Sequence, residues 1–347
     1  MSQANAPQRA QPTLKLRTPY LLFVGDAPSP SHAKTAFGIR DWAPETCLAQ
    51  MRLPGATVDL GLPEMTPEAA AAAGAGSILI GVAPVGGRIP EAWAPILKRA
   101  LDAGLDVVSG MHTPLAEVTG LLEASRKSGG ALIDVRAPRQ RFNVGTGIKR
   151  TGKRLLTVGT DCALGKKYTA LALTKALRQH GADATFRATG QTGVMIAGEG
   201  VAIDAVVADF IAGAAEALSP DAAPNHWDVI EGQGSLFHPA YAGVTLGLLH
   251  GSQPDAIVLC HDPTRTHVSA YPDFPLPDLR TAANRYIEAG RLTNPAIRLA
   301  AISLNTSELS AAERERVIAE TAQALGVPCF DPMKSSLDAA VRSVLQS

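Results

Sequence analysis

Short apolar runs alternate with amphipathic stretches along most of the chain. Apolar runs of about 4–8 residues are typical of buried strands, and apolar positions spaced by three or four residues are typical of helices. We therefore expect an α/β protein with largely parallel sheets covered by helices on both faces. In the first half, the predicted strands are 20–24, 56–60, 77–82, 105–108 and 131–135, the predicted helices are 67–73, 91–103 and 115–128, and residues 29–55 are predicted to be irregular.

The second half of the chain repeats this alternation. Its predicted strands are 155–158, 184–188, 226–230, 256–260, 297–304 and 327–330, and its predicted helices are 168–177, 203–218, 241–249, 278–290, 311–325 and 336–345. Between the halves, residues 137–154 are polar, glycine-rich and basic, which indicates a domain junction. Their charges are typical of a solvated linker, and the alternative is that they face an anionic ligand.

The most informative stretch is 155–174, where an apolar run ends at Gly159 and a short loop leads to Gly165-Lys166-Lys167 and a helical pattern. This is the order of a P-loop. Backbone N–H groups, the helix N-terminus and the lysine together form an anion cradle. The predicted cofactor-binding residues are Gly159, Thr160, Cys162, Ala163, Leu164, Gly165, Lys166, Lys167, Tyr168 and Thr169.

This loop departs from the common G-x-x-x-x-G-K-[ST] spacing. Gly159 lies one residue further from Gly165, and Lys167 stands where a magnesium-ligating hydroxyl is usual. The sequence therefore predicts phosphate binding without a bound metal, with the charge of Lys167 in its place. The alternative is a glycine-rich turn before a capped helix. The first half lacks the G-x-G-x-x-G pattern of dinucleotide binding. We expect three segments: a flexible tail at 1–19, a Rossmann-like domain at 20–150 and a P-loop domain at 151–347.

Polar residues follow several predicted strands, at the sheet edge where ligands bind in parallel α/β proteins. Glu231 ends an apolar strand and has Gly232 and Gly234 beside it, so we predict a catalytic carboxylate whose burial raises its pKa. His238 and His261 are alternative bases, although a structural histidine is common at such places. The candidate catalytic residues are Glu231, His238 and Asp161, and the candidate substrate-binding residues are His112, Arg136, Gln191, Thr192, Gln233 and Ser235, with Arg40 and Arg265 as further carboxylate-binding cations.

Composition excludes several function classes. The 347 residues are 46% apolar and 18% charged, with no net charge, so no basic surface for nucleic acid is indicated. Four dispersed cysteines form no C-x-x-C pair, which argues against a disulfide framework and structural zinc and favours a cytoplasmic location. The N-terminus does not resemble a signal peptide, and no apolar run is long enough to span a membrane. We also expect a homo-oligomer, most simply a homodimer.

Several segments together resemble a known family. They are GMHTPL (110–115), DVR (134–136), GTDCALGKKYTA (159–170), ATGQTG (188–193), AIDAVVADFIAGAAE (202–216) and EGQGSLFHPAYAGVTLGLLHG (231–251). They are similar to the DgcN-type D-glutamate N-acetyltransferases, formerly a domain of unknown function with a Rossmann-like N-terminal half and a P-loop C-terminal half. The resemblance implies transfer of acetyl from acetyl-CoA to the amine of D-glutamate, in D-amino-acid catabolism.

Two other functions stay open at this stage. The GTD and EGQGS elements also resemble dethiobiotin synthetase, which would make the chain an ATP-dependent ligase or kinase. Lys167 in place of the hydroxyl argues against that activity. A nucleotide-binding switch without small-molecule chemistry is the third possibility, and the many polar strand ends favour an enzyme instead.

Overall fold

The computed structural model describes residues 14–82, 88–137 and 141–346. These residues form two compact units. The N-terminal unit contains residues 14–137 and 191–205, and the P-loop unit contains residues 141–190 and 206–346. The segment 191–205 thus follows the P-loop helix in sequence but packs with the N-terminal unit, so a single boundary at residue 150 does not describe the packing.

The N-terminal unit is built on a five-stranded parallel sheet with the order β3-β2-β4-β5-β6. Every residue of β2, β4 and β5 is buried, which explains why these strands read as continuous apolar runs. The strands are β2 (Tyr20–Gly25), β3 (Cys47–Arg52), β4 (Ser77–Ile80), β5 (Asp106–Ser109) and β6 (Leu132–Asp134). The helices of this sheet are α1 (Lys34–Trp42), α2 (Pro67–Ala72), α3 (Ala94–Asp102) and α4 (Leu121–Ser128), with short 3₁₀ turns η1 (Pro30–Ala33), η2 (Pro44–Thr46), η3 (Glu91–Trp93) and η4 (Leu115–Glu117).

The strand predicted at 56–60 is wrong, and so is the irregular region at 29–55. The edge strand is β3, and residues 56–60 run beside it without joining the ladder. The buried side chain of Gln50 holds them there: its Oε1 accepts the N–H of Leu60 (2.7 Å) and its Nε2 donates to Asp59 (2.8 Å). A polar residue that is buried to bond a neighbouring segment interrupts the apolar run by which a strand is recognised.

The segment 191–205 forms α6 (Gln191–Ala197), β9 (Glu199–Gly200) and η5 (Ile203–Ala205). Strand β1 (Leu14–Lys15) pairs antiparallel with β9, and the hydroxyl of Tyr20 donates to the carbonyl of Met195 (3.3 Å). The predicted tail at 1–19 is therefore wrong from residue 14 onward, while residues 1–13 lie outside the described part. The helix predicted at 203–218 is shorter than expected, because its first residues belong to this segment.

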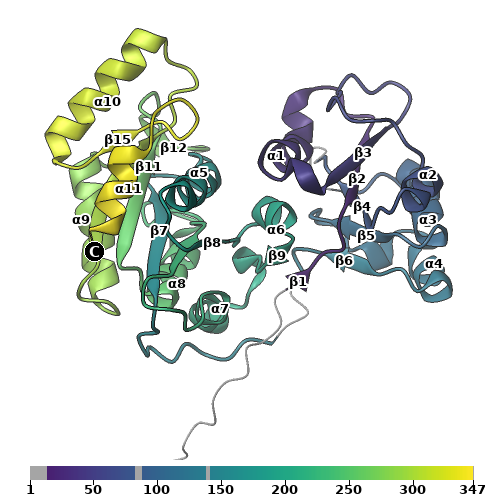
Figure 1. Cartoon of the computed structure of the whole chain (residues 1–347), viewed down its shortest axis with the longest axis horizontal. Coiled ribbons are helices and arrows are strands. Elements are labelled where there is room, and N and C mark those ends of the chain that lie inside the picture. Colours follow the sequence, from purple (N-terminus) through teal and green to yellow (C-terminus); the bar gives the residue numbers. More distant parts are fainter. Residues whose placement is uncertain (1–13, 83–87, 138–140, 347) are drawn as a thin grey trace, which may run out of the picture. The chain divides into compact units, whose positions relative to one another are not determined.

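The P-loop unit contains a six-stranded parallel sheet with the order β15-β14-β11-β7-β10-β8. Its strands are β7 (Lys153–Gly159), β8 (Ala184–Arg187), β10 (Trp227–Ile230), β11 (Ala256–His261), β14 (Arg298–Leu304) and β15 (Cys329–Phe330), and a small hairpin is made by β12 (His267–Val268) and β13 (Tyr271–Pro275). The helices are α5 (Lys166–Gln179), α7 (Ile211–Leu218), α8 (Ala242–Ser252), α9 (Leu279–Arg291), α10 (Ala311–Leu325) and α11 (Asp338–Leu345), and η6 (Ala208–Phe210) precedes α7. Each unit thus has the expected α/β architecture with a parallel sheet, which Figure 1 shows.

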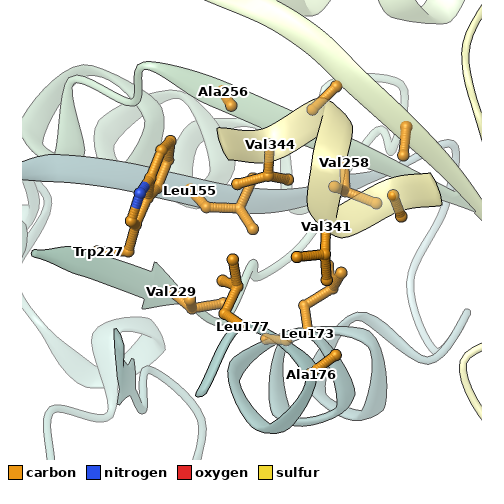
Figure 2. Close-up of a cluster of buried hydrophobic side chains, with 14 of the residues drawn as sticks. Leu155, Leu173, Ala176, Leu177, Trp227, Val229, Ala256, Val258, Val341 and Val344 are labelled. Atoms are coloured by element: carbon orange, nitrogen blue, oxygen red, sulfur yellow. The ribbon is translucent and has the colours of Figure 1, made fainter. Parts of the chain in front are cut away.

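Helix α5 is held against the sheet by a cluster of buried aliphatic side chains. Leu173 and Leu177 of α5 face Val341 and Val344 of α11, with Leu155 of β7 beside them (Figure 2). Burial of each large aliphatic side chain contributes about 1.5–3 kcal/mol. This packing fixes the first turn of α5 at the carboxyl end of β7, where the P-loop must lie. Among the described residues, no helix is long and apolar enough to cross a membrane.

The basic segment 137–154 has a structural role that differs from both hypotheses made from the sequence. The guanidinium of Arg154 is fully buried and donates to five main-chain carbonyls, those of Arg150, Thr151, Gly152, Ser219 and Pro220 (3.0–3.5 Å). Arg154 lies at the start of β7, whereas the P-loop follows the end of that strand. For Arg154, both a solvated linker and an anion-facing surface are therefore wrong.

Replacement of Arg154 by Met should lower the free energy of unfolding of the P-loop unit by about 2–4 kcal/mol, because several buried carbonyls lose their donors. Denaturant titration of the full chain measures this change. The control is Arg285→Met, since Arg285 lies on the exposed face of α9 in an ion pair with Glu288. Its effect should stay below about 0.5 kcal/mol. Equal effects of the two variants would contradict the structural role of Arg154.

Candidate functional site

The loop between β7 and α5 has the backbone geometry of an anion cradle. Gly165 precedes the helix with φ +97°, and Ala163 also has a positive φ of +53°. A left-handed residue other than glycine is unfavourable and is held in place by its surroundings. The buried side chain of Lys166 folds back over the loop, and its Nζ donates to the carbonyl of Asp161 (2.8 Å).

Asp161 fixes the shape of this loop. Its side chain is fully buried, and Oδ1 accepts the N–H of Cys162 (2.6 Å). Oδ2 accepts from Nη1 of Arg265 and from the N–H of Ser269 (2.7 and 2.8 Å). The same guanidinium nitrogen also donates to the carbonyl of Cys162 (2.9 Å). Both carboxylate oxygens are thus engaged, which suits a residue that positions the loop.

The end of β7 is packed closely against the chain that follows β10. The hydroxyl of Thr157 accepts the N–H of Gly232 (2.9 Å). A Cβ atom on Gly232 would lie 1.7 Å from the carbonyl oxygen of Thr157, so only glycine fits there. At the last residue of β7, the hydroxyls of Ser235 and Tyr286 both donate to the carbonyl of Gly159 (2.9 and 2.7 Å).

Glu231 lies directly after β10, and its side chain is 4% exposed. Its Oε2 accepts the N–H groups of Thr189 and Gly190 (3.1 and 3.0 Å). Burial raises the pKa of the Glu231 carboxyl, against the opposing effects of the Gly190 amide and of Lys167. The direction predicted for this pKa is therefore confirmed. Two amides orient the carboxylate through one of its oxygens.

Lys167 provides a second positive charge next to Lys166. Burial lowers the pKa of the Lys167 ammonium, and the charge of Glu231 acts in the opposite direction. The ammonium also lies over the ring of Tyr168, 4.5 Å from its centroid. In ordinary P-loop proteins a hydroxyl at this position and a carboxylate after a neighbouring strand hold magnesium. Here an ammonium takes the place of that hydroxyl, and its charge acts to lower the pKa of the Glu231 carboxyl.

Asp161, Cys162 and His238 have ligand atoms within 4.8 Å of one another, a grouping that could hold a metal ion. Their hydrogen bonds do not suit one. Nδ1 of His238 accepts the N–H of Ala240 (3.1 Å), so the proton of the neutral ring is assigned to Nε2. A histidine that binds a metal through Nε2 must carry its proton on Nδ1, whereas Nδ1 of His238 accepts a hydrogen bond. With Asp161 also engaged, the arrangement is better suited to a histidine that donates through Nε2.

The other candidate site residues lie at several separate places in the structure. Gln233 bonds the hydroxyl of Thr189 (3.1 Å) and therefore lies beside Glu231. Thr169 is turned away from the loop: its hydroxyl is buried against Ser303 (2.7 Å). His261 bonds the hydroxyl of Thr160 (2.9 Å), which places it at the loop but on the β11 side.

Four predicted substrate-binding residues belong to the N-terminal unit: His112, Arg136, Gln191 and Thr192. In this unit, Arg136 links the segment 191–205 to Gly110, which follows β5. Its Nε donates to Gly110 and Gln191 (3.1 and 2.9 Å), and its Nη1 pairs with Asp204 (2.9 Å).

Thr192 and the candidate cation Arg40 also have partners within this unit. Thr192 bonds Thr35 of α1 (3.2 Å). Arg40 lies in the last turn of α1 and pairs with Asp41 (2.6 Å), away from the strand ends.

Comparison with known proteins identifies the family. Residues 143–341 match a domain of unknown function described as the DUF1611 P-loop domain, and residues 51–138 match the corresponding Rossmann-like domain. The chain therefore belongs to the DUF1611 family. A DUF1611 family protein from Anabaena variabilis has a similar crystal structure, with a TM-score of 0.83, 34% identity and coverage of 95% of this chain and 100% of that one.

Two curated relatives in the same comparison are named D-glutamate N-acetyltransferase. The protein from Pseudoalteromonas is 46% identical over 95% of this chain and 100% of its own length. The protein from Tritonibacter scottomollicae is 47% identical over 92% of this chain and 96% of its own length. The family and the two-part α/β architecture expected from the sequence are thus confirmed.

Sequence reasoning about this DUF1611 chain missed the supports of the loop. Arg265 was considered as a carboxylate-binding residue, but it is engaged by Asp161. Ser269 and Tyr286 were not singled out. They follow the P-loop by more than 100 residues, and their role depends on contacts that no local pattern shows.

Substitution of Gly232 by Ala should distort the loop and remove most anion binding, because the new Cβ would collide with the main chain of Thr157. Gly243 provides a matched control, since a Cβ there meets nothing within 4 Å and alanine favours the helix by up to about 1 kcal/mol. Calorimetric titration with coenzyme A would measure binding, and thermal melting would measure folding. Normal binding by Gly232→Ala would show that the close approach is dispensable.

Proposed function

We propose that this chain is an N-acetyltransferase that moves the acetyl group of acetyl-CoA to the amine of D-glutamate. The named activity of two relatives that align with nearly the whole chain supports this function. The observation in the structure that carries the proposal is the P-loop, in which Lys166 folds back over the loop and Lys167 replaces the usual hydroxyl at the start of α5. Such a loop suits a ligand whose phosphates must be bound but not transferred.

Coenzyme A is a ligand of this kind, because it carries a pyrophosphate and a 3′-phosphate that take no part in acetyl transfer. The amide groups of 159–165 and the first turn of α5 can donate to phosphate oxygens. Lys166 and Lys167 would neutralise the charge that magnesium neutralises in nucleotide hydrolysis. No resident metal is needed for these contacts.

In the proposed reaction, the amine attacks the thioester carbonyl, a C–N bond forms and the C–S bond breaks. Coenzyme A leaves as its thiol, whose proton is the one that the nitrogen loses after the attack. The amine must first lose the proton of its ammonium form, and we assign this proton to Glu231. The two amides on Oε2 hold the carboxylate, and its raised pKa strengthens it as a base. His238 is better suited to donate from Nε2 to the carbonyl oxygen as negative charge develops there.

The four free cysteines fit a reducing compartment, and we place the enzyme in the cytoplasm. The homodimer stays a prediction, which sedimentation of the purified chain would check. The partners expected from this function are small molecules, with no role for nucleic acid.

Replacement of Glu231 by Gln should lower kcat about 10²-fold or more, the usual scale for loss of a general base, with little change in coenzyme A affinity. In the wild type, kcat/KM should fall as the pH is lowered through the Glu231 pKa, because the base must be ionised. This acid limb should lie above the ordinary glutamate range, since burial raises that pKa. Steady-state rates between pH 4 and 9, on the order of one point per half unit, would record the profile.

The matched variant is His238→Gln, which removes the imidazole but can still donate a hydrogen bond. We expect this variant to be slower but to keep the fall of kcat/KM at low pH. Glu231→Gln should lose that pH dependence. If Glu231→Gln instead keeps near-wild-type turnover while the His238 variant loses the limb, the histidine is the base and the assignment is wrong.

Coenzyme A should bind equally well with and without a chelator, because the charge that a metal would supply is supplied by Lys167. Titration calorimetry in magnesium buffer and in EDTA tests this expectation. Lys167→Ala should weaken binding about 10-fold or more, the scale of one lost charge-assisted hydrogen bond. A large loss of affinity on chelation, or tighter binding of ATP with magnesium than of coenzyme A, would favour the dethiobiotin-synthetase type of activity instead.

A further inference from the structure

Four aromatic side chains of the P-loop unit lie together, and we call them the aromatic patch. The ring centres of His238 and Tyr241 are 4.5 Å apart, and Tyr271 meets His238 edge to face at 5.0 Å. Phe274 continues the patch, 6.1 Å from Tyr271. Two segments contribute to it, since His238 and Tyr241 lie between β10 and α8, whereas Tyr271 and Phe274 belong to β13. Tyr241 and Phe274 are 53% and 47% exposed, so large aromatic faces are in contact with water.

The aromatic patch adjoins the P-loop. The N–H of Ser269, between β12 and β13, donates to the Asp161 carboxylate of the loop (2.8 Å). From the other segment, a ring nitrogen of His238 lies within 4.8 Å of a carboxylate oxygen of Asp161 and of the thiol of Cys162. Both segments of the patch are thus in place beside the anion cradle. A ligand whose phosphates bind the loop can therefore extend directly onto the aromatic rings.

The polar atoms of the aromatic patch are open to a ligand. His238 is only 3% exposed, and its Nδ1 accepts the N–H of Ala240, but nothing in the described part of the chain bonds its Nε2. The hydroxyls of Tyr241 and Tyr271 also have no hydrogen-bond partner among the described residues. Because buried polar groups are normally bonded, the open Nε2 of a buried histidine indicates a place for a ligand. The patch thus combines apolar ring faces with three open hydrogen-bonding groups.

We infer that the aromatic patch binds the pantetheine arm of coenzyme A, which joins the pyrophosphate to the thioester. The inference rests on the proposed acetyl-transfer function and adds the binding site of this arm. The methyl and methylene groups of the arm suit the ring faces, and its amides suit the tyrosine hydroxyls.

The position of His238 favours the arm over the adenosine of the same ligand. His238 is the residue assigned above to the carbonyl oxygen of the thioester, and the rings of Tyr241 and Tyr271 lie against it. The patch is therefore next to the end of the arm that carries the acetyl group. The adenosine is attached to the opposite end of the pyrophosphate, away from the thioester.

The test compares coenzyme A with 3′-phosphoadenosine 5′-diphosphate, which has the same phosphate positions and the same adenosine but lacks the arm. Phe274→Ala and Tyr241→Ala should each weaken the binding of coenzyme A about 3–10-fold, the scale of one lost aromatic contact. The KM for acetyl-CoA should rise by a similar factor. Binding of the shorter ligand should change less than about twofold, as expected for an exposed residue that does not touch it. Titration calorimetry measures both affinities, and thermal melting checks that the variants are folded.

The control variant is Leu292→Ala. Leu292 is an exposed apolar residue of the same unit, but it follows α9, where Asn294 bonds the carbonyl of Pro254 just before the amino end of β11. The P-loop and the aromatic patch lie at the other end of the sheet strands. Leu292→Ala should therefore bind both ligands as the wild type does.

Two results would contradict the inference. Equal weakening of both ligands by a patch variant with an unchanged melting temperature would mean that the patch holds the adenine. Unchanged affinity for both ligands would mean that the arm lies elsewhere. In either case the proposed function stands if the wild type transfers acetyl from acetyl-CoA to D-glutamate. If the wild type neither binds coenzyme A nor transfers its acetyl group, the proposed function itself fails.

Discussion

The P-loop unit depends on two lysine side chains and one carboxylate at the end of a parallel sheet, where Lys166 and Glu231 are buried and Lys167 is half-buried. Burial lowers the pKa of both Lys166 and Lys167 and raises that of Glu231, so it disfavours the charged form of each group. Their mutual attraction and their hydrogen bonds to the main chain offset part of this cost. The phosphates of the proposed coenzyme A would compensate the charges of the two lysines.

This constraint explains why the surrounding residues are small or form hydrogen bonds with the main chain. Gly232 must lack a side chain so that the chain after β10 can reach Thr157. Ser235 and Tyr286 satisfy the carbonyl of Gly159, which would otherwise be a buried acceptor beside the loop. Asp161 and Arg265 neutralise each other while they bond the loop backbone. The cradle is therefore preorganised by neighbouring elements and does not depend on the ligand for its shape.

The strands that could be predicted from sequence are those buried on both faces, such as β2, β7 and β11, because burial demands an uninterrupted apolar run. The P-loop could be found for a different reason: its glycines and lysine occur within a short local segment. The edge strand β3 could not be predicted from the sequence, since it contains the buried polar side chain of Gln50. The closeness of Glu231 and Gln233 could be read from the sequence, because both directly follow β10. The packing of residues 191–205 with the N-terminal unit could not be predicted, because it is determined by the long-range contacts of Arg136 with Gln191 and Asp204.

The arginines of this chain show why a count of charges says little about function. Arg154 lies at the amino end of β7 and bonds only main-chain carbonyls in a fully buried place, so its charge stabilises the fold. Arg265 is matched by Asp161 and Arg136 by Asp204, so neither can be counted as free positive charge for a ligand. In the P-loop unit, the position of a cation therefore says more than the number of cations: Lys166 and Lys167 lie at the N-terminus of α5, where main-chain N–H groups also favour an anion.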